Sequence, residues 1–200
     1  MTTTSSTGAV REKDLLQTIT RVVNTLRHNG IRFAVAGGCA AYARGGPPSE
    51  HDVDVFLKEG DVAAARTALV EAGMMPVDPP EDWLTKVFDG ELLVDLIFNP
   101  NGRPVTDELL DRAETLRVGP AEAPVVTGTD LMVDKVLVLG PHRCDFTPLL
   151  PIARELREQI DWAEVAEQTR ESPYARAFLN LVRELGIAES RPQSQRRRED

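Results

Sequence analysis

The sequence has no apolar run of about 18 residues, the length that a membrane-spanning helix requires. Its longest apolar stretches, at residues 92–98 and 131–139, each contain an aspartate. The stretch from Met1 to Gly8 is polar and lacks the charged start and apolar segment of a signal peptide. We therefore expect a cytoplasmic protein without a signal peptide or a membrane span.

Cysteine and histidine are scarce. Cys39 and Cys144 are too few for a disulfide framework and lack the spacing of metal ligands, so we expect each to be a small, at least half-buried residue. Sequence alone leaves open whether they meet in the fold. His51 and His142 have no partner at ligand spacing, which favours local hydrogen bonding over a Cys/His metal site.

Basic residues are outnumbered, and the net charge of −9 argues against non-specific nucleic-acid binding over the whole surface. The net charge does not exclude a local basic patch, and the Arg-rich stretch after Ser190 is the most basic segment. An acidic cluster that binds a cation would also fit this charge. With 200 residues, 42% of them hydrophobic, the chain is long enough for one globular domain or for a small core with a helical extension.

The first half of the chain alternates between helical and strand patterns, ended by glycine or proline. We expect helices at residues 11–29, 39–44 and 61–71 and strands at 31–36, 52–57, 83–88 and 91–98. The last two strands would form a hairpin through Asp89-Gly90. A short helix at 107–114 and one small edge strand at 125–126 would follow.

After Gly128 the pattern is helical, at about 130–139, 149–160, 162–170 and 174–185, and we find no internal repeat. The predicted fold is α+β: a small mixed or antiparallel sheet with flanking helices at residues 11–127, then a C-terminal helical bundle at 128–188. Residues 1–10 and 189–200 are expected to be flexible tails.

Three aspartates form the strongest candidate site. Asp52 and Asp54 alternate with Val53 and Val55, so both carboxylates should project from one face of a strand. Asp-x-Asp alone more often marks a solvated face. Asp95, however, interrupts an apolar run, where a lone carboxylate would cost several kcal/mol to bury. Three carboxylates close together repel one another. Divalent cations such as Mg²⁺ prefer carboxylate oxygens as ligands and would offset this repulsion.

Gly37 and Gly38 follow a short apolar strand and precede a helical segment. Glycine lets backbone amides approach a phosphate closely, and the start of a helix favours negative charge. A Gly-Gly pair alone is weak evidence, because it often marks only a tight turn. Its value here is its position one helix before the acidic pair.

In this order, Gly-Gly, Asp-x-Asp and a later Asp resemble the nucleotidyltransferase superfamily (DNA polymerase β-like). The longer pattern adds Arg44 after Gly-Gly-x-Ala, and Lys135 ahead of the Arg-Cys-Asp-Phe run that contains Asp145. It is similar to the AbiEii/MenT-type nucleotidyltransferase toxins of bacterial toxin–antitoxin pairs. The resemblance spans roughly residues 20–165.

The resemblance implies an enzyme that moves NMP from an NTP to an acceptor hydroxyl and releases pyrophosphate. Asp52, Asp54 and Asp95 would hold Mg²⁺, with two ions expected. Asp95 would also help to deprotonate the acceptor. Gly37 and Gly38 would cradle the triphosphate.

The toxin resemblance further implies that Lys135 reaches the phosphates, that Asp145 orients Lys135 or lines the site, and that Arg44 contacts phosphate or acceptor. It also implies the tRNA 3′ end as acceptor and a cognate antitoxin as partner. Ordinary interpretations remain open: Lys135 as a solvated lysine and Asp145 as the cap of the next helix.

Two residues depart from the family pattern. Cys39 and His51 stand where relatives often carry hydroxyl residues. Two other functions therefore stay open. One is nucleotidylation of an aminoglycoside or lincosamide antibiotic or of a protein hydroxyl, which the acidic surface would suit in the case of a cationic drug. The other is a catalytically silent relative that acts as a binding partner.

Overall fold

A seven-stranded mixed sheet organises the protein. The computed structural model describes residues 5–49 and 52–188, with side chains from residue 14 onward. The strands lie in the order β3-β4-β5-β2-β1-β7-β6, and only the pairs β2–β5 and β1–β7 are parallel among the described residues. The predicted α+β class is confirmed. The strands are β1 (Ala34–Val35), β2 (Asp52–Phe56), β3 (Met75–Val77), β4 (Leu84–Asp89), β5 (Leu92–Ile97), β6 (Glu114–Val118) and β7 (Ala121–Val125).

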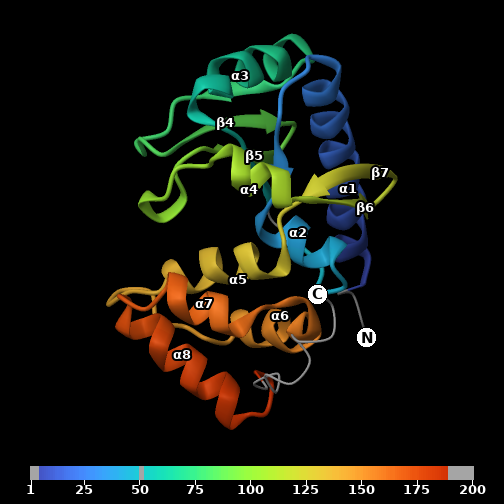
Figure 1. Cartoon of the computed structure of the whole chain (residues 1–200). Helices are drawn as coiled ribbons and strands as arrows, with labels where there is room; N and C mark the ends of the chain where they lie inside the picture. The colour runs from blue at the N-terminus through green and yellow to red at the C-terminus, as the bar shows by residue number, and fades with distance from the viewer. Residues whose placement is uncertain (1–4, 50–51, 189–200) are drawn as a thin grey trace, which may run out of the picture.

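Helices flank the sheet and then gather at the C-terminal end of the chain (Figure 1). Helices α1 and α3 lie against each other and against the sheet, and α5–α8 form a second group of helices below it in Figure 1. The helices are α1 (Ser5–His28), α2 (Gly37–Ala43), α3 (Val62–Glu71), α4 (Asp107–Arg112), α5 (Gly128–Leu137), α6 (Leu149–Glu155), α7 (Trp162–Gln168) and α8 (Pro173–Glu184), with short 3-10 helices η1 (Glu59–Asp61), η2 (Pro100–Gly102) and η3 (Arg157–Gln159).

The alternation in β2 decides which side chains reach the core and which reach the site. Val53 and Val55 are fully buried, while Asp52 and Asp54 project from the opposite face and are half-buried. The apolar stripe of α1, which includes Ile19, is also fully buried. Period-2 and period-3.6 patterns in the sequence therefore correspond to one shared core.

Side-chain caps fix the starts of the C-terminal helices. The Thr127 hydroxyl accepts from the amide of Asp130 at the start of α5, and Ser172 accepts from Ala175 at the start of α8. Apolar contacts hold the C-terminal helices together, among them an edge-to-face contact between Phe146 and Phe178 with ring centroids 5.4 Å apart. These local signals explain why the predicted helical segments lie within a few residues of the observed ones.

Several boundaries and strands differ from the expectations. Helix α1 begins at Ser5, so the expected tail at residues 1–10 is helical from Ser5 onward. The β4–β5 turn is centred on Gly90 and Glu91, with Gly90 at φ +63°, one residue later than an Asp-Gly turn would place it. Edge strand β3 was not expected, and the single short strand expected at 125–126 is a hairpin of β6 and β7.

No helix among the described residues is both long and apolar enough to cross a membrane. The tail expected at 189–200 lies outside the described residues, as do residues 1–4 and His51.

Candidate active site

The site rests on two neighbouring parallel strands. Strands β2 and β5 pair so that Asp54 lies directly beside Asp95, and Asp52 precedes Asp54 on the same face. One carboxylate oxygen from each of the three residues lies within 4.8 Å of the other two. The structure therefore brings together three aspartates that are spread over 43 positions of the sequence, from Asp52 to Asp95.

Burial and mutual repulsion perturb two of these carboxyl groups. Burial, followed by the nearby Asp52 carboxylate, raises the pKa of Asp54 from 3.8 to about 7, against the opposing effect of Lys135. Burial raises the pKa of Asp95 from 3.8 to about 6, against the opposing effect of Lys86. Both carboxylates would thus be stabilised by additional positive charge.

The donor set fits a divalent cation. Two carboxylate oxygens within 4.8 Å of each other repel by at least about 3 kcal/mol at an effective dielectric near 20. In addition, Oδ1 of Asp95 is buried and accepts no hydrogen bond from a described residue. An oxygen-only set that combines crowded negative charge with an unused buried acceptor suits Mg²⁺ or Mn²⁺.

Gly37 and Gly38 lie against this site for steric reasons. A Cβ on Gly37 would lie 1.6 Å from Oδ2 of Asp54, and Gly37 has φ +56°, a conformation that side chains rarely adopt. A Cβ on Gly38 would lie 2.4 Å from Oγ of Ser49. Gly37 therefore allows α2 to begin directly beside the Asp54 carboxylate, and Gly38 allows α2 to pack against Ser49. The predicted phosphate cradle stays a prediction.

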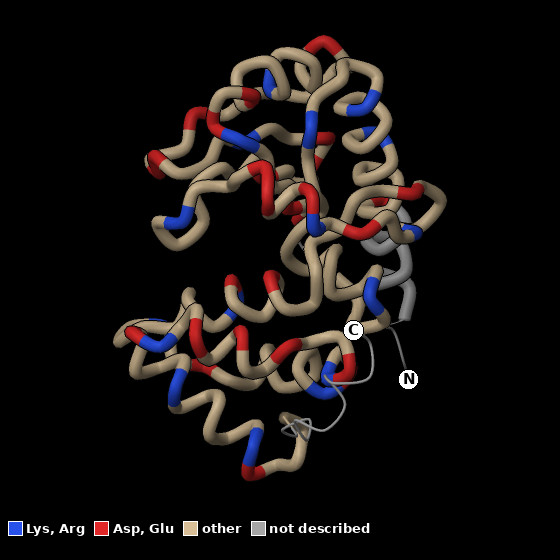
Figure 2. Tube along the Cα trace, viewed as in Figure 1, with Lys and Arg blue, Asp and Glu red and all other residues tan. Residues whose placement is uncertain are grey.

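Lys135 lies on α5 close enough to Asp54 to lower the pKa of that carboxyl group. Its neighbour Asp134 accepts a 2.6 Å hydrogen bond from the side-chain amide of Asn101, which connects α5 to η2. Asn101 has φ +54° and is the one described residue other than glycine with a positive φ. Lys135 on α5 is thus near the Asp54 carboxylate of the sheet, and Figure 2 shows acidic positions both on α5 and on the segments above it.

Two charged residues near Asp95 were not singled out from the sequence. Lys86 on β4 lies directly beside Asp95 in the sheet, with Nζ 3.9 Å from Oδ1 of Asp95. The same Nζ lies 3.9 Å from Oε1 of Glu81 in the preceding loop. The hairpin signal at Asp89-Gly90 could have pointed to Lys86, since it puts β4 beside β5 with Lys86 on the face of Asp95.

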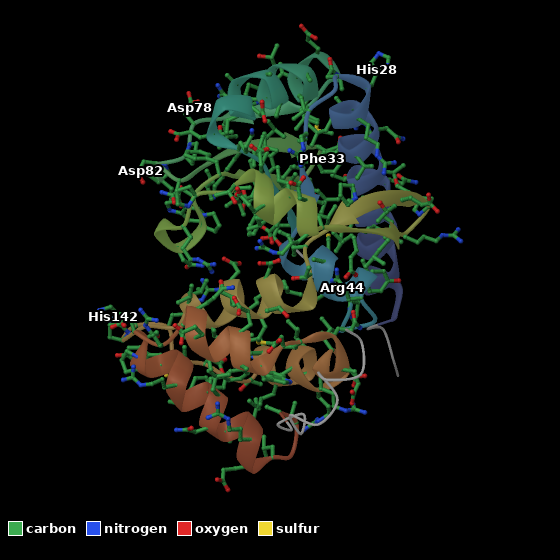
Figure 3. The ribbon with its side chains drawn as sticks, in the orientation of Figure 1. His28, Phe33, Arg44, Asp78, Asp82 and His142 are labelled. Atoms are coloured by element: carbon green, nitrogen blue, oxygen red, sulfur yellow. The ribbon has the colours of Figure 1, made fainter. Side chains whose placement is uncertain are left out.

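Arg44 does not occupy the predicted phosphate or acceptor position. Its guanidinium is buried and donates to the backbone carbonyls of Val126 at 2.6 Å and Val125 at 3.4 Å. It also bonds Glu114 and Gln159, at 3.0 and 3.2 Å. Figure 3 shows Arg44 where α2 approaches the C-terminal helices. We therefore assign it a structural role that joins α2 to β7 and to the segment after α6.

Asp145 does not reach Lys135. It is exposed and accepts a 2.9 Å hydrogen bond from the amide of Thr147, which lowers the pKa of its carboxyl group and stabilises the turn before α6. No hydrogen bond or ion pair joins it to Lys135 within the described part of the chain. The ordinary interpretation, a local turn-stabilising aspartate, thus accounts for its contacts.

The cysteines do not meet. Cys39 is buried with its thiol 3.6 Å from the carbonyl of Asp52, and burial raises its pKa to about 12. Cys144 is exposed and free, so the expectation that it is at least half-buried is wrong. His142 is exposed near the outer end of the C-terminal helices (Figure 3). None of these residues adds a ligand to the aspartate site.

The arrangement of sheet and helices is that of known nucleotidyltransferases. ANT(2″)-Ia in complex with adenylyl-2″-tobramycin shares 12% identity at a TM-score of 0.55, covering 86% of this chain and 98% of that chain. An antigenic nucleotidyltransferase-like protein from Paracoccidioides brasiliensis shares 19% identity at a TM-score of 0.52, covering 86% and 88%. At such identities the likeness establishes the fold. No curated protein matches the sequence.

The family is established by the sequence itself. Residues 1–188 match the model of a family described as uncharacterised nucleotidyltransferase, and the chain belongs to this family. The protein is therefore a nucleotidyltransferase, and the site at β2 and β5 is its candidate active site.

Proposed function

We propose that the protein is a Mg²⁺-dependent enzyme that transfers NMP from an NTP to an acceptor hydroxyl and releases pyrophosphate. The observation that carries the proposal is the convergence of Asp52, Asp54 and Asp95, whose carboxylate oxygens lie within 4.8 Å of one another. Bound divalent ions would supply charge neutralisation for the triphosphate and activation of the acceptor hydroxyl.

The chain's own residues would divide the work. Asp52 and Asp54 would hold the ions on β2, and Asp95 would complete the set and take the proton of the acceptor hydroxyl. The amides of Gly37 and Gly38 would contact the triphosphate, because they form the start of α2 and Gly37 brings that end of the helix against Asp54. Lys135 would approach the same phosphates from α5 as a point charge.

For the acceptor we propose the tRNA 3′ end, with the protein acting as an AbiEii/MenT-type, growth-inhibiting toxin that a cognate antitoxin neutralises. The support is the motif order shared with those toxins. This proposal also requires the RNA to approach a chain of net charge −9, so binding would be local to the site.

A second acceptor class is favoured by charge. Carboxylates of the sheet and of α5 surround the site, which suits a cationic antibiotic such as an aminoglycoside. ANT(2″)-Ia, which shares the fold, was solved with adenylylated tobramycin. The two proposals share one chemistry and differ only in the hydroxyl that attacks.

One experiment separates them. The protein is incubated with each α-³²P-labelled NTP and Mg²⁺, together with total tRNA, an aminoglycoside mixture, or a lincosamide. Label in RNA supports the toxin proposal, and label in drug supports the resistance proposal. If no acceptor receives label while the Asp54→Asn variant behaves like the wild type in every assay, the enzyme proposal is wrong and a silent binding relative is left.

A further inference from the structure

A row of charged side chains crosses three neighbouring strands. Asp54 on β2 pairs with Asp95 on β5, and Asp95 pairs in turn with Lys86 on β4. Directly paired residues project from the same face of a sheet, with Cβ atoms about 5 Å apart. Lys86 is therefore fixed by the sheet register, on the side of Asp95 opposite Asp54.

Asp95 has little else to hold it. Its strand neighbours Val94 and Leu96 are fully buried, and the residue itself is 8% exposed. Its Oδ1 atom accepts no hydrogen bond from a described residue. Among the described residues, Lys86 is the one cation within 4.0 Å of this carboxylate. Orientation of Asp95 thus depends on Lys86 more than on any hydrogen bond.

Lys86 is itself restrained. Its side chain is 21% exposed, and its Nζ lies 3.9 Å from Oδ1 of Asp95 and 3.9 Å from Oε1 of Glu81. The ammonium group is thus placed between two carboxylates. The other oxygen of Glu81, Oε2, is buried without a hydrogen bond from the described residues, so Glu81 has no stronger described partner than Lys86.

We propose that Lys86 is a positioning residue of the active site, which holds the Asp95 carboxylate in the orientation that completes the divalent-metal site. The inference rests on the proposed function, because it takes Asp95 as a metal ligand. Carboxylates that bind metals are themselves held by outer partners, and loss of such a partner typically lowers metal affinity or activity about 10–100-fold.

Electrostatics alone predicts the opposite effect, which makes the proposal testable. A positive charge close to a metal ligand repels the metal, so a lysine that merely neutralised Asp95 would weaken binding, and its removal would strengthen it. A lysine that positions Asp95 must do the reverse. The direction of the change therefore separates the two roles.

The test measures Mn²⁺ affinity by electron paramagnetic resonance on the full chain at pH 8, without nucleotide. Lys86→Met and Lys86→Gln keep much of the side-chain volume and lose the charge. We expect both to bind Mn²⁺ about 10–100-fold more weakly than the wild type. Lys86→Arg should recover most of the affinity. Lys58→Met is the matched control, since Lys58 forms an exposed ion pair with Asp107 at 3.0 Å.

Transfer kinetics give a second readout. In the Lys86 variants kcat should fall by a larger factor than KM for the NTP rises, because Lys86 lies on the side of Asp95 away from Asp54. Thermal unfolding followed by circular dichroism identifies any variant that fails to fold, and the remaining variants then decide.

The outcomes are distinct. Unchanged or tighter Mn²⁺ binding in folded Lys86→Met and Lys86→Gln, or no recovery in Lys86→Arg, overturns the proposal. If the wild type binds Mn²⁺ more tightly than Lys86→Met but transfers no nucleotide to any acceptor, the positioning role stands and the proposed function fails.

Discussion

The contact between Gly37 and Asp54 allows a sharp prediction about the link between α2 and the carboxylates. In Gly37→Ala the new methyl group would lie 1.6 Å from Oδ2 and 2.5 Å from Cγ of Asp54. The backbone cost of φ +56° is about 1–2 kcal/mol for a residue with a side chain. Overpacking against the carboxylate adds about 1–3 kcal/mol, so we expect a total loss of about 2–5 kcal/mol in the free energy of unfolding.

Gly30 provides the matched control for this prediction. It has φ +66°, and a Cβ there would meet nothing within 4 Å. Gly30→Ala should therefore lose only the backbone cost, about 1–2 kcal/mol. Urea denaturation of both variants measures the difference, which isolates the clash with Asp54.

A double-mutant cycle assigns the clash to its partner. In the Asp54→Ala background, most of the excess cost of Gly37→Ala over Gly30→Ala should disappear, because Oδ2 and Cγ are gone and only the Cβ of residue 54, 2.9 Å from the new methyl group, is left in contact. In the native background, Gly37→Ala should also weaken Mn²⁺ binding at least about tenfold by displacing a ligand. Equal destabilisation by Gly37→Ala and Gly30→Ala, together with unchanged Mn²⁺ affinity, would refute the reasoning.

Three further predictions follow from the charges of the structure. The pKa values of Asp54 and Asp95 are raised to about 7 and about 6, so the folded metal-free protein retains protons that the unfolded chain releases. Its stability to urea should therefore fall as the pH rises from roughly 4 to 7. Saturating Mg²⁺ should reverse the fall. A rise in stability over that range without metal would contradict it. Arg44→Met should lower the free energy of unfolding by about 1–3 kcal/mol, because it leaves buried carbonyls without a donor, while the KM of the folded variant for NTP stays unchanged; a selective rise in KM would restore the phosphate-binding role. Asp145→Ala should change thermal stability by less than about 0.5 kcal/mol and leave transfer activity intact, whereas loss of transfer would show a role at the site that its exposed turn contact does not provide.

The central strands were predictable because their patterns are strong. Asp52 to Phe56 alternates polar and apolar residues, and Leu92 to Ile97 is a nearly continuous apolar run, so both were placed within one residue of their observed bounds. Their parallel pairing could not be read from either pattern, since it depends on the crossover through α3, β3 and β4. The convergence of the three aspartates was predicted because a carboxylate at Asp95, buried without a partner, would be costly.

The missed strands have weak local signals. Strand β3 contains Pro76 and is mostly exposed, and β7 contains Pro124, which interrupts its apolar alternation. Strand β3 is held in the sheet by pairing with β4, and β7 by pairing with β1, 90 positions earlier at Val35↔Val125, as well as with the adjacent β6. Contacts with other strands therefore determine that these segments form strands.

The roles of single charged residues were the least predictable part of the site. Arg44 follows the glycine pair as a phosphate-binding arginine would, yet its partners lie at Glu114, Val126 and Gln159, 70 to 115 positions away. Lys86 belongs to no motif, and its place beside Asp95 is set by the pairing register of β4 and β5. A motif defines neither the direction of a long side chain nor its distant partners.

The most direct test of the account is a Mn²⁺ titration, followed by electron paramagnetic resonance, of the wild type and of Asp52→Asn, Asp54→Asn and Asp95→Asn at pH 8. Each substitution keeps the side-chain shape and removes one negative charge from the site. The account predicts saturable binding by the wild type and at least about tenfold weaker binding by each variant. Absence of binding by the wild type, or equal affinity in all four proteins, would contradict the claim that these three aspartates form a divalent-metal site.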